Sequence, residues 1–306
     1  MSDSTAPDES SVYDVIVIGA GPAGLSAALN LARARRTVLV LDSNRPRNAA
    51  TLKSHGYLSR DGISPLELRK LGREELEAYP EASFEKLAVT SVEGAAGAFT
   101  VTAGAESFFA ARILIATGLT EVMPALPSLR TFYGTSVHSC MECDAYEYAD
   151  RPIALIGETD DLAFRATLLS QWSRDLIVFT NGVGSVSTED EVALAGRGIR
   201  VERRPVADIS GDRTGLTGVT LVDGETIARE GAFMRPVYTP KLDYIAALEL
   251  ETDDDGSLVV DAVGRTSVPG VYAAGDSTAP GPQQLIVAAG AGGRVAAAIN
   301  RDLLGI

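Results

Sequence analysis

Cysteine and histidine are scarce in this sequence, with two of each among 306 residues. So few cysteines exclude a secreted disulfide framework. A four-ligand zinc site would need all four side chains, and their spacing does not suggest one, so we expect no metal centre. Basic residues are also few, because 27 Lys and Arg stand against 41 Asp and Glu, for a net charge of −14. Phosphate backbones and anionic lipids would repel such a chain, so we expect neither nucleic acid nor membrane as a partner.

Long apolar runs are missing as well. No stretch of about 18 apolar residues occurs, so we expect no transmembrane helix. The first eleven residues are polar and acidic, unlike the basic and apolar regions of a signal peptide. We therefore interpret residues 1–11 as a disordered lead-in and expect a cytoplasmic protein. The chain is 45% hydrophobic and 22% charged, as in ordinary globular proteins, and its length allows roughly two domains.

The hydrophobic pattern predicts an α/β fold with one architecture used twice. Apolar runs at 15–18 and 37–41 flank an Ala- and Leu-rich stretch at 22–35, which indicates a strand–helix–strand unit. A second cycle of strand, helix, strand, helix and strand is expected at 153–156, 162–172, 176–179, 189–195 and 199–202. The other expected elements are a helix at 66–79, strands at 88–92, 98–102, 112–116 and 271–274, an acidic turn at 253–256 and a closing helix at 284–300.

A glycine-rich turn follows the first strand and opens the first helix, with the residues Gly19-Ala20-Gly21-Pro22-Ala23-Gly24. This context is typical of a dinucleotide site. The first glycine permits a tight turn, the second lets a pyrophosphate approach, and the third lets helix pack on strand. The helix N-terminus then favours phosphates. Asp42 ends the next strand, where a carboxylate can accept from a ribose hydroxyl and disfavour a 2′-phosphate. A structural glycine turn without a ligand is the alternative.

Both cysteines lie in one motif, Cys140-Met141-Glu142-Cys143. Two residues between the thiols suit a reversible disulfide at a helix start, where the helix dipole favours a thiolate. Two buried cysteines that merely lie close together are the alternative. His138 precedes the pair by two residues, where an imidazole could hold the thiolate or shuttle a proton near neutral pH; a plain surface histidine is the alternative.

Three motifs, GAGPAG at 19–24, ATG at 116–118 and TSVPGVYAAGD at 266–276, resemble in this order the two-domain flavoprotein disulfide reductases. The resemblance implies FAD at the first site. The cysteine pair, just before the second cycle, resembles the low-molecular-weight thioredoxin reductases, and this likeness spans residues 12–304. It implies a homodimer with two Rossmann-like (three-layer ββα) domains, the second inserted in the first. Residues 12–118 and 245–306 would form the FAD-binding domain, and residues 119–244 the inserted domain that carries the cysteines.

The same resemblance implies the roles of single residues. Cys143 would contact the flavin, and Cys140 would exchange with the substrate. Asp144 would act as acid and base for a leaving thiol, unless it only stabilises the helix start. His55 is expected at the flavin pocket, with a packing histidine as the alternative. The full set of expected cofactor-binding residues is Gly19, Gly21, Pro22, Ala23, Gly24, Asp42, Asn48, His55, Val89, Thr117, Gly118, Gly275, Asp276, Gln284 and Leu285.

The NADPH fingerprint of thioredoxin reductases is missing from the second cycle. The equivalent turn reads Ile156-Gly157-Glu158-Thr159-Asp160-Asp161, so only Gly157 remains. Up to three carboxylates lie where a pyrophosphate would bind, and each close charge would repel it by about 1 kcal/mol or more. The stretch Val178–Gly182 also lacks the family's arginine cluster. We therefore predict that NADPH is an unlikely cofactor here.

Three stretches, residues 45–48, 55–62 and 169–173, resemble the dithiol oxidases of the gliotoxin and holomycin kind, which pass electrons through FAD to O2. Asp144 departs from these oxidases, which typically carry His there. We predict an FAD-dependent thiol–disulfide oxidoreductase, with dithiol oxidation favoured and a small dithiol, a disulfide or a thioredoxin-like protein as partner. One alternative is a disulfide reductase fed by ferredoxin or an atypical NAD(P)H mode, although the acidic charge argues mildly against ferredoxin docking. A non-catalytic flavin redox sensor is another.

Overall fold

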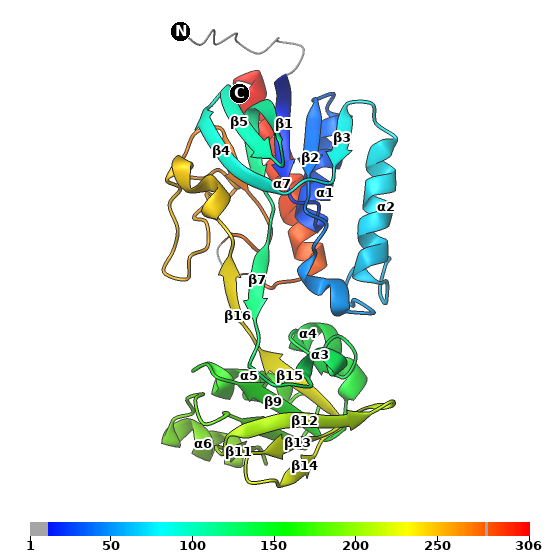
Figure 1. The fold of residues 1–306 in the computed structure, drawn as a ribbon, viewed down its shortest axis with the longest axis vertical. Helices are drawn as coiled ribbons and strands as arrows, with labels where there is room; N and C mark the ends of the chain where they lie inside the picture. Colours follow the sequence, from blue (N-terminus) through cyan, green and yellow to red (C-terminus); the bar gives the residue numbers. More distant parts are fainter. Residues whose placement is uncertain (1–11, 279–280) are drawn as a thin grey trace.

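The computed structural model describes residues 12–278 and 281–306, so the lead-in expected to be disordered at residues 1–11 lies outside the described residues. The chain forms two bodies joined by a two-stranded ribbon (Figure 1). The ribbon consists of β7 (Leu119–Val122) and β16 (Val237–Pro240), which pair antiparallel. It lies at the expected junction between the two domains, whose exact boundaries stay a prediction.

The upper body is built on a seven-stranded sheet with the order β3-β2-β1-β6-β5-β4, and β17 pairs with β6. β1, β2, β3, β6 and β17 run parallel, whereas β4, β5 and β6 form an antiparallel meander. Its strands are β1 (Val12–Ile18), β2 (Val38–Leu41), β3 (Ala82–Glu85), β4 (Val89–Ala95), β5 (Ala98–Ala103), β6 (Glu106–Ile115) and β17 (Val271–Ala273). Its helices are α1 (Pro22–Arg33), η2 (Arg47–Ala50), α2 (Pro65–Glu77), η4 (Asp243–Leu248) and α7 (Leu285–Leu304).

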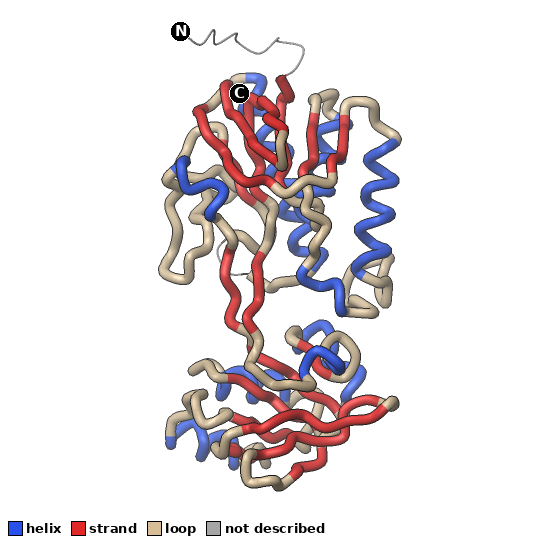
Figure 2. The backbone as a smooth tube through the Cα atoms, viewed as in Figure 1, coloured by secondary structure: helices blue, strands red, loops and turns tan. Residues whose placement is uncertain are grey.

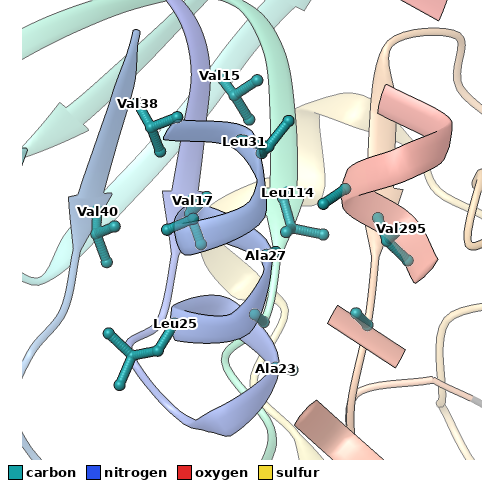
Figure 3. Close-up of a cluster of buried hydrophobic side chains, with 14 of the residues drawn as sticks. Val15, Val17, Ala23, Leu25, Ala27, Leu31, Val38, Val40, Leu114 and Val295 are labelled. Atoms are coloured by element: carbon teal, nitrogen blue, oxygen red, sulfur yellow. The ribbon is translucent and has the colours of Figure 1, made fainter. Parts of the chain in front are cut away.

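The core of the upper body positions two helix starts at one edge of this sheet. Val15, Val17 and Leu114 pack with α1, and Val295 of α7 joins the same cluster (Figure 3). The helices approach closely because Gly292 in α7 has no side chain, and a Cβ there would overlap the backbone of Ala23. The carboxyl ends of parallel strands share one edge, so the turns after β1, β6 and β17 come together there.

The lower body has a parallel five-stranded sheet with the order β11-β10-β9-β15-β8 and a separate antiparallel sheet of β12, β13 and β14 (Figure 2). The strands are β8 (Val137–His138), β9 (Ile153–Gly157), β10 (Leu176–Phe179), β11 (Arg200–Glu202), β12 (Val206–Asp212), β13 (Gly215–Leu221), β14 (Thr226–Ala228) and β15 (Gly231–Arg235). The helices are α3 (Leu129–Phe132), α4 (Met141–Asp144), η3 (Ala145–Tyr148), α5 (Leu162–Leu169) and α6 (Thr188–Ala195).

The predicted α/β class with two Rossmann-like units is confirmed, and both predicted cycles are present. Several ends differ from prediction. The first helix ends at Arg33 rather than residue 35, because Arg35 adopts a positive φ of 64°. The helix predicted at 162–172 ends at Leu169, and α7 continues to Leu304. Within the described residues, no helix combines the length and apolar character needed to cross a bilayer.

Candidate functional site

The first glycine-rich turn packs against the turn that follows β6. Gly19 has a φ of +108°, and a Cβ there would overlap the Ala116 carbonyl group. A Cβ on Gly24 would overlap the carbonyl oxygen of Gly19, so helix and turn lie in direct contact. By contrast, among the described residues nothing lies within 4 Å of a Cβ built on Gly21. The middle of the turn is therefore open to a ligand, and its two flanks are closed by the chain itself.

Two helices begin at this edge without side-chain caps. Gly21, which has no side chain, precedes α1. Gln284 precedes α7, and within the described part of the chain its side chain does not cap that helix. Neither helix has an acidic residue in its first turn. Their first N–H groups are thus available as donors to phosphate or to a flavin ring. Pro22 and Leu285, two of the expected cofactor residues, are the first residues of these helices. The donor set fits an anionic dinucleotide such as FAD.

Asp42 is held by the chain in a way that leaves little room for a ribose. Its carboxylate accepts from the backbone N–H groups of Ala20 and Asn44, both at 2.6 Å, and from Arg69 at 2.9 Å. A carboxylate offers about four acceptor positions, so about one remains for a ribose hydroxyl. Arg69 is only 5% exposed, and burial lowers its pKa despite the pairing with Asp42. The sequence pattern missed Arg69, because an arginine in an amphipathic helix ordinarily faces solvent.

The remaining predicted cofactor residues are spread around this edge. Thr117 lies 3.3 Å from the hydroxyl of Tyr244, whose pKa is raised by burial. Gly275 packs on Ala23, since a Cβ there would lie 3.0 Å from the Ala23 Cβ. Gly118 follows β6 with a φ of 66°, Asn48 lies in η2, and Val89 opens β4 opposite Ala103. Their cofactor contacts stay predictions.

His55 lies in the loop after η2 and contacts both bodies. Its Nδ1 is 3.3 Å from Asp61 in the same loop, and its Nε2 is 3.4 Å from Glu147 of the lower body. The Asp61 carboxylate also accepts from the Gly56 N–H, and these bonds lower the pKa of Asp61. The expected place of His55 at the flavin pocket stays untested, while its two ring nitrogens contact one carboxylate from each body.

Cys140 and Cys143 form a disulfide, with their Cα atoms 5.3 Å apart. Both residues are partly exposed, so a substrate thiol can approach them. The helix that follows Cys140, α4, has only four residues before it passes into η3. The helix dipole expected at this position is therefore weak, and side chains must supply most of the electrostatic control of the pair.

Asp144 and His138 form a buried pair behind the disulfide. They are 9% and 8% exposed, and His138 Nδ1 lies 3.4 Å from Asp144 Oδ1. The other ring nitrogen is 3.3 Å from the Tyr148 hydroxyl and 3.2 Å from the Thr135 carbonyl oxygen. The His138 ring also packs against the rings of Tyr148 and Phe233. The alternative that His138 is a plain surface histidine is wrong, because the aromatic rings cover it.

The turn after β9 differs from the predicted cluster of repelling carboxylates. Asp161 accepts from Thr159 at 2.7 Å, from Arg165 at 2.6 Å and from Arg235 at 2.9 Å. Burial alone would raise the pKa of Asp161, but these donors outweigh burial and lower it. Two arginines thus neutralise this carboxylate, so charge repulsion by Asp161 is a weaker argument against a nucleotide than the sequence implied.

The turn after β9 is closely packed by its neighbours. A Cβ on Gly157 would lie 2.8 Å from a methyl carbon of Leu162 and 2.9 Å from the Arg235 Cβ, so the turn packs directly against α5 and β15. The loop after β10 also folds back onto the turn, where the Ser185 N–H donates to the Thr159 carbonyl at 3.2 Å. A Cβ on Gly184 would lie 2.7 Å from the Gly157 oxygen. As at Gly19 and Gly24, the chain itself closes the flanks of this turn, and Thr159 stands at the position that corresponds to the open Gly21.

The family described as pyridine nucleotide-disulphide oxidoreductase matches residues 13–292. The chain belongs to this family. Members form an enzyme class with a disulfide active site, and the family implies FAD as cofactor. A thioredoxin reductase of Mycolicibacterium smegmatis is 31% identical over 296 residues, covering 92% of this chain and 93% of the relative.

Two further similarities place this pyridine nucleotide-disulphide oxidoreductase among thioredoxin reductase-like proteins. A probable thioredoxin reductase of Arthroderma benhamiae is 33% identical over 189 residues, which is 60% of this chain. That match spans 46% of the relative's own length. The solved structure described as HlmI has a TM-score of 0.92 and 36% identity, and the similarity covers 98% of this chain and 95% of that one.

Proposed function

We propose that this enzyme oxidises a dithiol at the Cys140–Cys143 pair and passes the electrons to FAD and then to O2 or another non-nicotinamide acceptor. The observation that supports this proposal is the turn after β9, where only Gly157 of the nucleotide fingerprint remains and the Ser185 N–H binds the Thr159 carbonyl. A thioredoxin reductase-like enzyme that does not bind NADPH needs another source of electrons. A dithiol substrate supplies two electrons directly to the disulfide, so this direction is consistent with the site.

The disulfide itself performs the substrate chemistry by thiol–disulfide exchange. A substrate thiolate attacks the sulfur of Cys140, a mixed disulfide forms, and Cys143 leaves as a thiolate. The second thiol of the substrate then displaces Cys140, so the substrate departs as a disulfide and the enzyme pair is reduced. FAD, when bound, supplies the two-electron acceptor for this pair. With O2 as final acceptor, dithiol and O2 become disulfide and hydrogen peroxide.

Asp144 and His138 handle the protons of this exchange. Asp144 follows Cys143 directly in the chain and is buried, and we assign it the exchange of protons with the leaving thiol. The His138 ring can donate from Nδ1 to Asp144, which orients the carboxylate. In this role His138 positions Asp144, and Asp144 exchanges protons with the thiols.

Disulfide reduction is the second candidate function, because the similar proteins carry the name thioredoxin reductase. It would require a protein donor such as a ferredoxin, or an atypical NAD(P)H mode. The partner in either direction would be a small dithiol or disulfide, or a thioredoxin-like protein. A homodimer in the cytoplasm remains our expectation from the resemblance.

The test is oxygen consumption by the purified yellow enzyme with dithiothreitol as the probe dithiol. We expect one hydrogen peroxide for each dithiol oxidised, and loss of this turnover in Cys140→Ser with FAD still bound. Oxygen consumption that persists in Cys140→Ser would refute the disulfide route. No turnover with dithiol and O2, together with reduction of a disulfide by NADPH, would replace the proposal with the reductase.

A further inference from the structure

Arg47 is the centre of a set of contacts that joins the two bodies, and neither the sequence pattern nor the proposed chemistry gives it a role. It lies in η2 of the upper body, in contact with the ribbon. Its guanidinium donates to Asp276 at 2.8 Å and lies 3.7 Å from Glu121 of β7. It also stacks over the ring of Tyr238 in β16, at 5.0 Å from the ring centre. One arginine thus holds both ribbon strands and the carboxylate that precedes α7.

From Arg47 the contacts continue to the disulfide segment. The hydroxyl of Tyr133 lies 3.2 Å from Glu121 and 2.9 Å from the hydroxyl of Ser139, which directly precedes Cys140. Burial raises the pKa of Glu121, although the bonds from Tyr133 and Arg47 act to lower it. Asp276 at the predicted flavin site is therefore connected to the residue beside Cys140 by a continuous series of polar contacts.

A second route runs from Arg47 to the turn after β9. Arg235 lies 5.5 Å from the centre of the same Tyr238 ring that Arg47 covers. Arg235 also binds Asp161, so Tyr238 is shared between an arginine of the upper body and the arginine that occupies the turn after β9.

Close packing supports the same arrangement of the bodies. Gly134 has a φ of +82°, and a Cβ there would overlap the backbone of Ala50 in η2. The contact of His55 Nε2 with Glu147, at 3.4 Å, also joins the two bodies. Figure 1 shows α3 and α4 on the side of the lower body that faces the upper body. The disulfide segment is thus held toward the sheet edge where the flavin site is predicted.

We propose that Arg47 is a positioning residue that fixes the disulfide-bearing body against the FAD-binding body through Tyr238 and Glu121. The inference rests on the proposed function, because a fixed arrangement suits an enzyme whose lower body has no nucleotide to present. Dithiol exchange at Cys140 and electron transfer to the flavin then occur in one arrangement. We call the ribbon strands β7 and β16, held by Arg47, the brace, because they fix the two bodies and do not act as a hinge.

Small-angle X-ray scattering of the purified holoenzyme tests the brace without reference to activity. Wild-type protein is expected to fit a single rigid arrangement, whereas Arg47→Ala broadens the distribution of distances between the bodies. Arg47→Lys keeps the charge but loses the planar guanidinium and its stacking on Tyr238, so it should keep the rigid arrangement only in part. Arg45→Ala is the matched control, because Arg45 is exposed in the same loop and makes no ion pair within the described residues.

The second readout is the rate at which dithiothreitol bleaches the flavin under anaerobic conditions. A displacement on the order of 1 Å can slow a reaction about 100-fold, so we expect a loss of that size in Arg47→Ala and none in Arg45→Ala. If Arg47→Ala does not fold, Glu121→Gln gives the same test through the ribbon. Unchanged scattering and rate in these variants would overturn the brace. Wild-type flavin that no dithiol bleaches would instead refute the proposed function, while the scattering comparison would still decide the brace.

Discussion

Replacement of Gly134 by alanine tests how tightly the disulfide segment packs against the upper body. Gly134 has a φ of +82°, and its new Cβ would lie well inside 3.0 Å of the Ala50 carbonyl group, a distance that real Cβ atoms do not keep. The two segments must part on the order of 1 Å to restore a contact of about 3.5 Å. Because Gly134 lies six residues before Cys140, this movement displaces the disulfide from the flavin site.

The matched control separates this displacement from backbone strain. Gly198 in the lower body has a φ of +80°, and nothing described lies within 4 Å of a Cβ there. A left-handed conformation costs a non-glycine residue about 1–2 kcal/mol. Gly198→Ala should therefore lose about this much unfolding free energy and keep its activity. Gly134→Ala should lose at least as much and should also reduce its flavin about 100-fold more slowly with dithiothreitol.

The assays are urea denaturation for stability and anaerobic stopped-flow absorbance for flavin reduction. Equal rates in the two alanine variants would refute the reasoning, since both carry the same strain and only one carries the clash. A slow Gly198→Ala variant would show that strain in the lower body, and not contact with Ala50, controls the rate.

The remaining predictions concern the thiol pair, its acid and one surface ion pair. Cys143→Ser should leave FAD bound, and its free Cys140 thiolate should attack a disulfide probe such as oxidised glutathione and expel one glutathione thiol. The mixed disulfide should persist because no second cysteine resolves it, and mass spectrometry should locate it at Cys140; a probe bound elsewhere would contradict the assigned roles. Asp144→Asn should slow steady-state dithiol oxidation by about 10²–10⁴-fold, the range for general acid–base groups, and an unchanged rate would remove Asp144 from the proton path. The bond from Arg204 lowers the pKa of Glu202 to about 2 from 4.5. The stability that this bond adds is therefore present above pH 4.5 and lost as the pH falls toward 2. Glu202→Gln should lower the melting temperature at pH 6 and converge with wild type in acid, and a constant difference would contradict the linkage.

The pattern of apolar runs and glycines predicted most of the framework. The strands and helices around Gly19 and Gly24 have the expected order, because buried parallel strands carry a strong local signal. The ribbon strands β7 and β16 and the antiparallel strands β12 to β14 were missed. β7, β14 and β16 have only three or four residues, so their alternation is weak. β12 and β13 have seven residues each, but glycines and shifts of register interrupt their pattern. The disulfide was predictable because both cysteines share one motif.

The residues that connect distant segments were beyond the sequence pattern. Arg47 and Arg69 look like surface arginines in a loop and a helix, yet they bind Asp276 and Asp42, which lie 229 and 27 positions away. The surroundings of Asp161 could not be predicted from the sequence either. A count of charges suggested repulsion, and only the fold reveals that Arg165 and Arg235 neutralise it. Local motifs predict turns, whereas such pairings depend on tertiary packing.

Anaerobic reduction of the flavin by two donors tests the central claim most directly. Excess NADPH or NADH is added to one cuvette of the purified protein and dithiothreitol to another, and the flavin absorbance is followed. The turn after β9, where only Gly157 of the nucleotide fingerprint remains, predicts that only the dithiol bleaches the flavin and that air restores the colour. Rapid bleaching by NADPH would contradict this account, because it would mean that a nucleotide binds without that fingerprint.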